Sequence, residues 1–475
     1  MKSILFAASE ALPFASTGGL GDVAGSLPAA LAKLGCDARV VIPLYSSIDE
    51  KYRREMHFIC AIRVRLSWRN QYCGVFSLVK DGVTYYFLDN EFYFKRVSMY
   101  GNYDDGERFA FFCKAVLDMM PYIDFFPDIL HTNDWHTALA AIYLKRKYGQ
   151  IERYSEIRSV HTIHNIEYQG VYDFSILDDV FDLPPSNASI VDYNGLVNLT
   201  KGAIVCCDRL TTVSPRYAEE IMTETFASGL HYILGENSYK IVGILNGIDV
   251  DYYNPATDPA IPAHYTSDDF SGKATCKAEL QRRYGLPVEP DKPMIAMISR
   301  LASHKGMNLV ERILDELLQQ DVQFVVLGKG EIQYERFFRG IEERYNNKAR
   351  AIIEYNKELS KLVYAASDIF LMPSRTEPCG LSQMIASRYG SIPLVRETGG
   401  LYDSIKNYNP SDRSGNGFTF KNYNAHEMLF ALKDAVKFMT ESHEEWEALV
   451  RHVMNVDFSW DLSAERYIDM YSEII

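Results

Sequence analysis

The chain has 475 residues, with 49 Lys and Arg against 63 Asp and Glu, giving a formal net charge of -14. This length exceeds what one hydrophobic core supports and predicts two or three domains. The acidic balance argues against a nucleic-acid-binding protein, which normally presents a basic surface. An anionic small molecule stays possible, because it needs only a local cluster of Arg, Lys and helix N-termini.

The eight cysteines include no C-x-x-C pair, which indicates reduced thiols and a cytoplasmic protein. We expect no membrane contact, since no stretch approaches the ~18 apolar residues of a spanning helix. The apolar opening "MKSILFAASE" is short and interrupted by Glu10, so it predicts a buried strand rather than a leader.

The first half of the chain alternates strands and helices. A strand at 2–9, a glycine loop, a helix at 22–34 and a strand at 39–45 predict a βαβ unit and therefore a parallel sheet. Short alternating runs in 57–90 predict an inserted antiparallel patch. Alternation then returns with helices at 105–120 and 137–147 and the strands "DILHTN", "SVHTIHN", "RLTTVS" and "KIVGILNG".

Residues 251–272 are rich in Pro, Asp and Tyr and predict a linker. A second α/β series follows, with apolar strands typical of a sheet covered on both faces, and residues 462–475 predict a terminal amphipathic helix. We therefore expect two parallel α/β domains of similar size. Ligands bind at the carboxyl ends of parallel strands, so two such domains facing each other would line a cleft.

Thr-Gly-Gly-Leu-x-Asp occurs twice, at 17–22 and at 398–403. We interpret each copy as a backbone cradle that its half supplies to one shared site. Coincidence is the alternative, because Gly-Gly pairs are common turn formers.

Two motifs of the second half follow apolar strands directly. "SRLASHKG" places Arg300 and Lys305 in a loop that enters a helix, an arrangement that suits a diphosphate. "PSRTEPCGLSQMIASRYG" places Glu377 in a turn before a helix expected to begin at Gly380. The alternative for Arg300 and Lys305 is that both are solvated surface cations. The alternative for Glu377 is an acid that the helix dipole favours at a helix start.

"HTNDWH" and "HTIHNIEYQG" lie at strand ends of the first half. His161 and His164 would point to opposite faces of an extended segment, and neither Cys nor H-E-x-x-H accompanies them, so zinc is disfavoured. A polar cluster for a sugar, with Trp135 as a stacking platform, fits better. P-loop, G-x-G-x-x-G and G-x-S-x-G motifs are absent, which disfavours NAD and ordinary α/β-hydrolase chemistry.

The chain resembles bacterial glycogen synthases and plant starch synthases, glycosyltransferase family 5, which have the GT-B fold. The resemblance runs from residue 4 to residue 471 through "TGGLGDV", "RVVIPLYSSI", "YGNYDDGERFAFFCKA", "NDWHTAL", "TIHNIEYQG", "TTVSPRYAEEI", "GILNGIDVDYYNPATD", "SRLASHKG", "MPSRTEPCGLSQM", "YGSIPLVRETGGLYDSI" and "FSWDLSAERYIDMY". It implies an N-terminal Rossmann-like domain at 1–250, a nucleotide-sugar domain at 251–455, and a helix at 456–475 that crosses back onto the first domain.

The resemblance also implies retaining transfer of glucose from a nucleotide diphosphate glucose to the non-reducing end of an α-1,4-glucan such as glycogen, without metal or cofactor. His164, Arg300, Lys305 and Glu377 would be catalytic, with the two cations on the diphosphate. The implied substrate-binding residues are Ser16, Thr17, Gly18, Gly19, Asp22, Asp134, Trp135, Asn165, Asn246, Tyr355, Cys379, Gly380, Leu381, Thr398, Gly399 and Gly400.

The first loop departs from the family's K-T-G-G-L pattern, because Ser16 stands where the lysine is usual. A lost cation beside a diphosphate removes a contact of ~1.5–3 kcal/mol, so UDP-glucose becomes an option beside the default ADP-glucose. Two further hypotheses are a catalytically weak paralogue that binds glucan or regulates a partner, and a GT-B transferase with a small acceptor.

Overall fold

The computed structural model describes residues 2–475, which fall into two compact units. Unit 1 runs to Asn246 and includes Trp460–Ile475, whereas unit 2 is Gly247–Ser459. Residues 247–250 and 456–459 therefore lie in unit 2. The segment 251–270 carries no helix or strand and leads into α11 (Ser271–Arg283).

Unit 1 is built on one nine-stranded sheet in the order β12-β11-β7-β6-β1-β2-β5-β4-β3. The seven strands from β12 to β5 pair with one another in parallel. β4 and β3 extend the sheet beyond β5 by antiparallel pairing. The strands are β1 (Ser3–Ala7), β2 (Asp37–Pro43), β3 (His57–Leu66), β4 (Arg69–Lys80), β5 (Val83–Asp89), β6 (Ile129–Asn133), β7 (Arg158–Ile163), β11 (Arg209–Thr212) and β12 (Ile241–Gly243).

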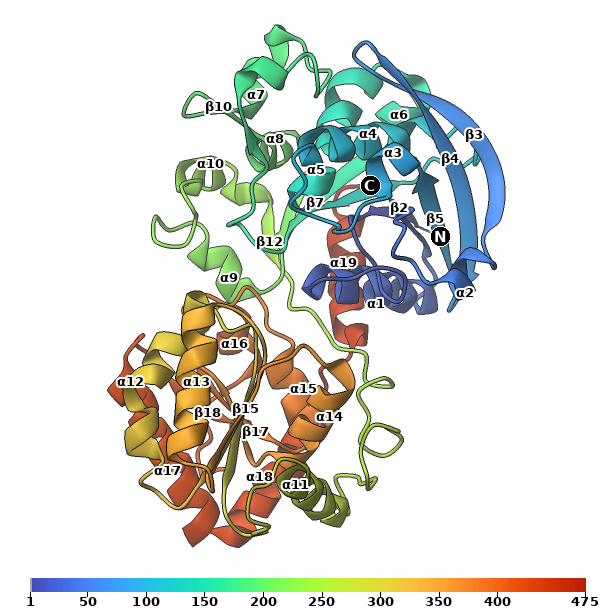
Figure 1. The fold of residues 1–475 in the computed structure, drawn as a ribbon. Helices are drawn as coiled ribbons and strands as arrows, with labels where there is room; N and C mark the ends of the chain where they lie inside the picture. Colours follow the sequence, from blue (N-terminus) through green and yellow to red (C-terminus); the bar gives the residue numbers. More distant parts are fainter. Residues whose placement is uncertain (1) are drawn as a thin grey trace. The chain divides into compact units, whose positions relative to one another are not determined.

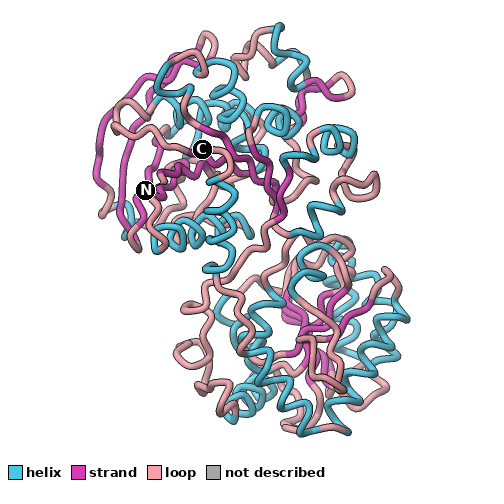
Figure 2. The backbone as a smooth tube through the Cα atoms, turned by 180° about the vertical axis from the view of Figure 1, so that it is seen from behind, coloured by secondary structure: helices cyan, strands magenta, loops and turns pink. Residues whose placement is uncertain are grey.

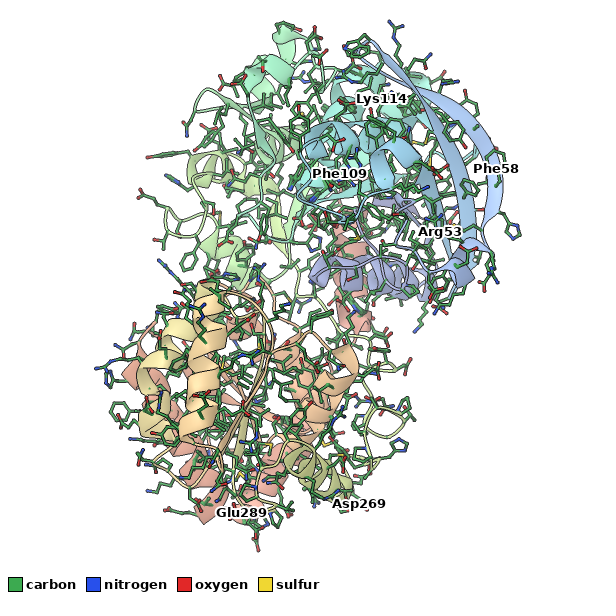
Figure 3. The ribbon with its side chains drawn as sticks, in the orientation of Figure 1. Arg53, Phe58, Phe109, Lys114, Asp269 and Glu289 are labelled. Atoms are coloured by element: carbon green, nitrogen blue, oxygen red, sulfur yellow. The ribbon has the colours of Figure 1, made fainter. Side chains whose placement is uncertain are left out.

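The inserted antiparallel patch expected at 57–90 is wrong in one respect. β5 pairs in parallel with β2 through Val40 and Tyr85, so the hairpin extends the main sheet. β5 is buried along most of its length, which requires cover on both of its faces. The β3–β4 hairpin curves around the outside of the unit, where Phe58 is exposed (Figures 1 and 3).

Helices cover both faces of this sheet (Figure 2). The main ones are α1 (Gly19–Lys33), α4 (Asp105–Asp118), α5 (Asp134–Tyr143), which continues as a π turn at Leu144–Tyr148, α8 (Leu199–Cys206) and α19 (Trp460–Ser472). α19 packs beside α1 (Figure 1). The buried Tyr471 hydroxyl lies 2.7 Å from Nδ1 of His131 on β6, which fixes the C-terminal helix to unit 1.

Shorter elements complete unit 1. They are α2 (Glu50–Arg53), α3 (Glu91–Phe94), α6 (Glu152–Ser155), α7 (Ala188–Val191), α9 (Pro215–Glu220), α10 (His231–Glu236) and a small sheet of β8 (Val171–Tyr172), β9 (Asp192–Tyr193) and β10 (Leu196–Asn198). Across residues 2–475, the helices all fall short of the length and apolarity that crossing a bilayer demands.

Unit 2 is built on a six-stranded parallel sheet in the order β15-β14-β13-β16-β17-β18. Its strands are β13 (Met294–Ile298), β14 (Gln323–Leu327), β15 (Ala349–Ile352), β16 (Ile369–Met372), β17 (Ile392–Arg396) and β18 (Phe418–Phe420). Its later helices are α12 (Met307–Leu317), α13 (Ile332–Arg344), α14 (Lys357–Ala366), α15 (Ser382–Arg388), α16 (Gly399–Ser404), α17 (Ala425–Glu441) and α18 (His443–Met454).

Three helix starts differ from the sequence-based expectation. α1 begins at Gly19 rather than at residue 22, α5 at Asp134 rather than at 137, and α15 at Ser382 rather than at Gly380. Gly380 lies two residues before α15 and has a φ of +70°, a left-handed conformation that glycine adopts without steric cost. The glycine therefore turns the chain before the helix instead of opening it.

Candidate active site

The site residues of unit 2 follow the carboxyl ends of its parallel strands, which all meet at one edge of the sheet. Arg300 follows β13, Glu377 follows β16 and Thr398 follows β17. Tyr355 follows β15 and is mostly exposed. The sequence motifs of this half thus gather at the edge where a parallel sheet binds its ligands.

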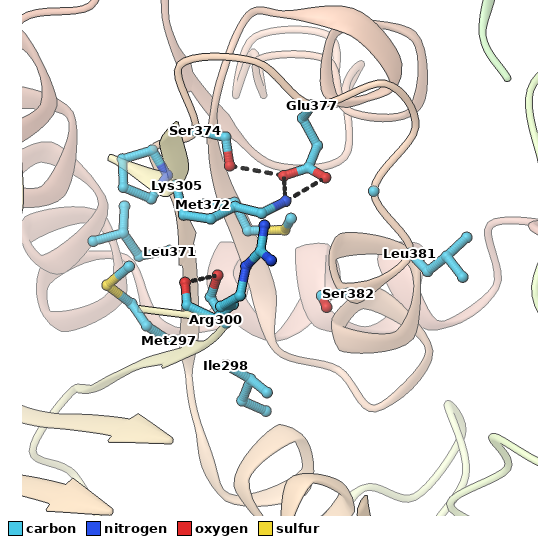
Figure 4. A pocket seen from close by; sticks show the side chains of 13 residues that line it. Met297, Ile298, Arg300, Lys305, Leu371, Met372, Ser374, Glu377, Leu381 and Ser382 are labelled. Carbon is cyan, nitrogen blue, oxygen red and sulfur yellow. Dashed lines mark hydrogen bonds and ion pairs between the residues drawn. The ribbon is translucent and has the colours of Figure 1, made fainter. Parts of the chain in front are cut away.

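Glu377 and Lys305 form a close ion pair at this edge (Figure 4). Nζ of Lys305 lies 2.8 and 2.7 Å from the two carboxylate oxygens, and the Ser374 hydroxyl donates to Oε2 at 2.8 Å. Glu377 is buried, so its charge depends on these partners. The carboxylate and the ammonium are consequently held in one defined position.

A pocket of about 210 Å³ opens beside this pair. Arg300 also lines it (Figure 4), and its guanidinium lies 3.3 Å from Nε2 of His304. Gly306 permits the tight turn after Lys305, since its φ is +80° and a Cβ there would lie 2.1 Å from the Pro373 carbonyl oxygen. The other lining residues include Ser299, Met372, Ser374, Gly380, Leu381 and Ser382.

The second Thr-Gly-Gly loop packs directly on the Glu377 turn. The Gly400 amide donates to the Glu377 carbonyl oxygen at 3.1 Å, and a Cβ on Gly399 would lie 2.0 Å from the same oxygen. A Cβ on Gly400 would lie 2.1 Å from the carbonyl oxygen of buried Cys379. Thr398 is buried as the N-cap of α16, so the two motifs form one packed structure.

Asp134 and His164 lie together at the carboxyl edge of the unit 1 sheet. Oδ1 of Asp134 accepts the His164 amide at 2.8 Å, and Asp134 adopts an unusual φ of +53°. Burial raises the pKa of Asp134 to about 7, although amide bonds from His164 and Asn165 oppose this. Burial lowers the pKa of His164 to about 3, so its ring is neutral at physiological pH.

The tautomer of His164 follows from Asn133. The side-chain amide of Asn133 donates to the Ala7 carbonyl at 3.1 Å, which leaves Oδ1 facing Nε2 of His164 at 2.9 Å. Nε2 therefore carries the proton and donates it to Asn133. The His164 ring is therefore neutral and fixed in orientation.

Asn246, Asn165 and Trp135 complete the unit 1 set. Asn246 is buried, and its side-chain oxygen has no hydrogen-bond partner within residues 2–475. Asn165 caps its own turn through the Glu167 amide at 3.0 Å. Trp135 stacks on His136 at 4.2 Å between ring centroids and also packs edge-on against Phe109 of α4, which Figure 3 labels.

The ring of Trp135 is also covered from the loop side. A Cβ on Gly170, which has a φ of +63°, would lie 2.7 Å from the indole ring. The structure thus places the indole in the packed wall of unit 1, with one face already taken by protein.

The first Thr-Gly-Gly loop lies at the start of α1. Thr17, Gly18 and Gly19 are exposed, Asp22 is half-buried in the first turn, and the Ser16 hydroxyl donates to the Gly18 carbonyl at 3.2 Å. Beneath the loop, the buried carboxylate of Glu10 accepts the Thr17 amide, the Thr17 hydroxyl and the Gly21 amide at 2.7, 2.8 and 3.0 Å.

The other histidines of the two strand-end motifs have separate partners. His131 bonds Tyr471 and Thr162, His161 bonds Thr132, and His136 stacks on Trp135. Within residues 2–475, no group of three or more His, Cys, Asp or Glu side chains is arranged to hold a metal ion. These three histidines make hydrogen bonds and ring contacts.

Sequence reasoning missed Glu10 and Ser374 as site residues. Glu10 carried a signal, because an acidic residue directly after an apolar strand and before a glycine loop is out of place unless it has partners. Nothing in the sequence pointed to Ser374, since serine is common in turns that contain Pro and polar residues.

Comparison with known proteins agrees with this geometry. Residues 3–236 match the family described as starch synthase catalytic domain, and residues 281–450 match glycosyl transferases group 1. The chain is 45% identical over 474 residues to a glycogen synthase of Anoxybacillus flavithermus, covering 99% of this chain and 98% of that protein. It is 46% identical to a glycogen synthase of Bacillus cereus over the full length of both.

Solved structures give the same result. The catalytic domain of starch synthase IV from Arabidopsis thaliana, bound to ADP and acarbose, superposes with a TM-score of 0.91 at 35% identity, covering 99% of both chains. A sucrose-phosphate synthase from Thermosynechococcus elongatus has a TM-score of 0.61 at 14% identity, covers 100% of this chain and 99% of its own, and shares the fold alone.

The fold and the family matches define a glycosyltransferase of the GT-B class, as the resemblance predicts. The chain belongs to the family of bacterial glycogen synthases and plant starch synthases. It is a hexosyltransferase with glycogen synthase function, which confirms the activity expected from the sequence motifs.

Proposed function

We propose that the chain transfers glucose with retention from ADP-glucose to the non-reducing end of an α-1,4-glucan, with UDP-glucose as the alternative donor. The bond between the anomeric carbon and the diphosphate oxygen breaks, and a bond to the 4-hydroxyl oxygen of the terminal glucose forms. The proton of that hydroxyl leaves with the nucleoside diphosphate. The relative from Arabidopsis thaliana, whose structure contains ADP, supports an adenine nucleotide.

The observation that carries the proposal is the Lys305–Glu377–Ser374 arrangement beside the pocket that Arg300 lines. Two cations at the end of β13 suit the charge that develops on a departing diphosphate. The Glu377 carboxylate is assigned to the sugar hydroxyls and to support of an oxocarbenium-like transition state. No step is assigned to a metal or cofactor.

The residues of unit 1 are assigned to the transferred glucose. His164, Asn165 and Asn246 are proposed to contact it, and the unpartnered oxygen of buried Asn246 supports this because such an oxygen gains from a sugar hydroxyl. Trp135 is proposed to shape the wall. The first Thr-Gly-Gly loop with Asp22, the second Thr-Gly-Gly loop and Tyr355 are all proposed to face the donor.

A glucan-binding paralogue without activity is not favoured, because the Lys305–Glu377 pair is intact. The deciding experiment measures steady-state glucose transfer to glycogen with ADP-glucose and UDP-glucose side by side, with Glu377→Ala as the inactive control. Faster transfer from ADP-glucose supports the proposed donor, whereas preference for UDP-glucose reverses it. Glycogen binding without transfer from either donor would overturn the enzymatic proposal.

A further inference from the structure

Glu10 is a buried carboxylate of unit 1 that the proposed chemistry leaves without a role. It follows β1, is 2% exposed, and accepts three hydrogen bonds, all from the first Thr-Gly-Gly loop. No cation of residues 2–475 forms an ion pair with it within 4 Å. Its compensation therefore comes from the loop, from the start of α1 and from the side chain of Tyr100, which also favours the charged form.

The start of α1 depends on this carboxylate. The N-cap residue, Gly18, offers no side chain to the helix, and the first amides of any helix lack intrahelical acceptors. Glu10 accepts the amide of Gly21, the third residue of α1, and so replaces the missing cap from outside the helix. A carboxylate at this end is also favoured by the helix dipole.

The two anchor points, Thr17 and Gly21, lie on either side of the exposed glycines. Within the described residues, the amides of Gly18, Gly19 and Leu20 have no acceptor. The loop packs loosely otherwise, since a Cβ on Gly19 would meet nothing within 4 Å and one on Gly18 only Oε1 of Glu10 at 4.0 Å. Glu10 is thus a main anchor of these amides, beside two main-chain bonds: the Gly21 amide donates to the Gly18 carbonyl at 3.2 Å, and the Leu12 amide donates to the Gly21 carbonyl at 2.9 Å.

We propose that Glu10 is a positioning residue for the nucleotide-sugar donor, which holds the amides of the Gly18–Leu20 segment in place for the donor's diphosphate without touching the donor. The inference rests on the proposed function, in which this loop faces the donor. It predicts that loss of the carboxylate weakens donor binding while binding of the glucan stays unchanged.

Glu10→Gln is the informative substitution because it keeps the size and shape of the side chain while removing its charge. A carboxylate accepts at both oxygens, whereas an amide accepts at one oxygen and turns an NH₂ group toward the other donor. Either the Thr17 amide or the Gly21 amide then faces another donor, and the loop moves away from it. Thr17→Val provides an independent change, since it removes only the hydroxyl bond.

Asp128 offers a matched control in the same unit. Its Oδ2 accepts the amide and the hydroxyl of Ser3 at 2.7 and 2.8 Å, the same pattern that Glu10 makes with Thr17. Ser3 begins β1, so this contact lies at the amino ends of the strands, the opposite edge of the sheet from the loop. Asp128→Asn therefore loses equivalent bonds away from the donor loop.

The test measures the Kd of ADP and of UDP by calorimetry and the KM of donor and glycogen for the intact protein and each variant. We expect Glu10→Gln to raise the nucleotide Kd and the donor KM about tenfold, as loss of a charge-assisted contact does, with the glycogen KM within about twofold. Thr17→Val raises the same constants by a smaller factor. In the double variant Glu10→Gln/Thr17→Val, the increase is smaller than the product of the two single increases, because both changes act on the same contact. Asp128→Asn leaves all constants unchanged.

The inference is overturned if Glu10→Gln and Asp128→Asn act alike, if the donor and glycogen constants rise together, or if nucleotide binding tightens because a negative charge has been removed. If Glu10→Gln does not fold, Thr17→Val decides: the inference requires that its nucleotide Kd and donor KM rise while its glycogen KM does not. Nucleotide binding without transfer in the unmodified protein refutes the proposed function, while the Kd values still test Glu10. An unmodified protein that binds neither nucleotide overturns both.

Discussion

The two Thr-Gly-Gly loops share five residues of a six-residue pattern but are held in place by different means. In the first, Thr17, Gly18 and Gly19 are exposed, and one side-chain carboxylate anchors the loop from below. In the second, Thr398 and Gly399 are buried, and the glycines press against main-chain carbonyls of the Glu377 turn. The same short sequence therefore forms an adjustable loop in unit 1 and a fixed one in unit 2.

The carboxylates next to the loops differ in the same way. Glu10 and Asp134 of unit 1 are held by amides and hydroxyls, whereas Glu377 of unit 2 is held by the ammonium of Lys305. A cation fixes the charge of its partner, while burial among neutral donors makes ionisation costly. Mutations that separate backbone support from side-chain charge can therefore test the comparison.

The largest effect is expected for Glu377→Gln, which removes the charge but keeps the backbone oxygen under the second loop. Lys305 loses its anion, and we expect kcat for glucose transfer to fall on the order of 1000-fold, as for removal of a group that stabilises the transition state. Steady-state kinetics with glycogen measure this. A fall of less than about tenfold would show that the carboxylate only supports structure.

Asp368→Asn is the matched control for Glu377→Gln. Asp368 pairs with Lys277 at 2.7 Å, is largely buried, and precedes the same strand, β16, at its amino end. We expect its loss to lower Tm while kcat of the folded protein changes by less than about twofold. An equal loss of activity in both variants would point to general destabilisation of unit 2.

The second largest effect is expected for Gly399→Ala. Its Cβ would lie 2.0 Å from the Glu377 carbonyl oxygen, and its φ of +43° adds strain of about 1–3 kcal/mol. Displacing the Glu377 turn by about an ångström should lower transfer about 100-fold. Gly19→Ala, where nothing lies within 4 Å, should cost less than about tenfold. Equal losses would mean that the two loops are equally constrained.

A smaller effect, in the opposite direction, is expected for Ser16→Lys in the adjustable loop. Ser16 is half-buried, and a longer side chain has solvent to extend into beside exposed Thr17. A cation facing the diphosphate should lower the KM of ADP-glucose about tenfold, less so at high salt. Ser16→Gln controls for length without charge. An unchanged or higher KM for the lysine variant would show that this position does not face the diphosphate.

The sequence predicts the elements well because the apolar strands and the loops after them are local patterns. It places Arg300, Glu377 and both glycine loops at strand ends, and parallel pairing then brings them to one edge of each sheet. The role of Glu10 is not local, since it depends on which amides fold over it. The parallel pairing of β5 with β2 was also missed, because alternation predicts a strand but not its neighbour.

The smallest effect concerns pH and Asp134. Burial raises its pKa from 3.8 to about 7, so between these values the folded chain binds a proton that the unfolded chain has released. This group's contribution to the free energy of unfolding therefore falls as pH rises from about 4 to 7 and is constant above. Tm of Asp134→Asn minus Tm of the unmodified protein should rise through that range and then level off.

The same measurement links Asp134 to Glu10. The negative charge of Glu10 adds to the raised pKa of Asp134, so Glu10→Gln should move the midpoint of that rise to lower pH. Repulsion between their negative charges therefore couples Glu10 and Asp134 of unit 1, whereas attraction to Lys305 holds the Glu377 carboxylate of unit 2. A Tm difference that stays constant or falls from pH 4 to 7 would contradict a raised pKa, and an unmoved midpoint would contradict the coupling.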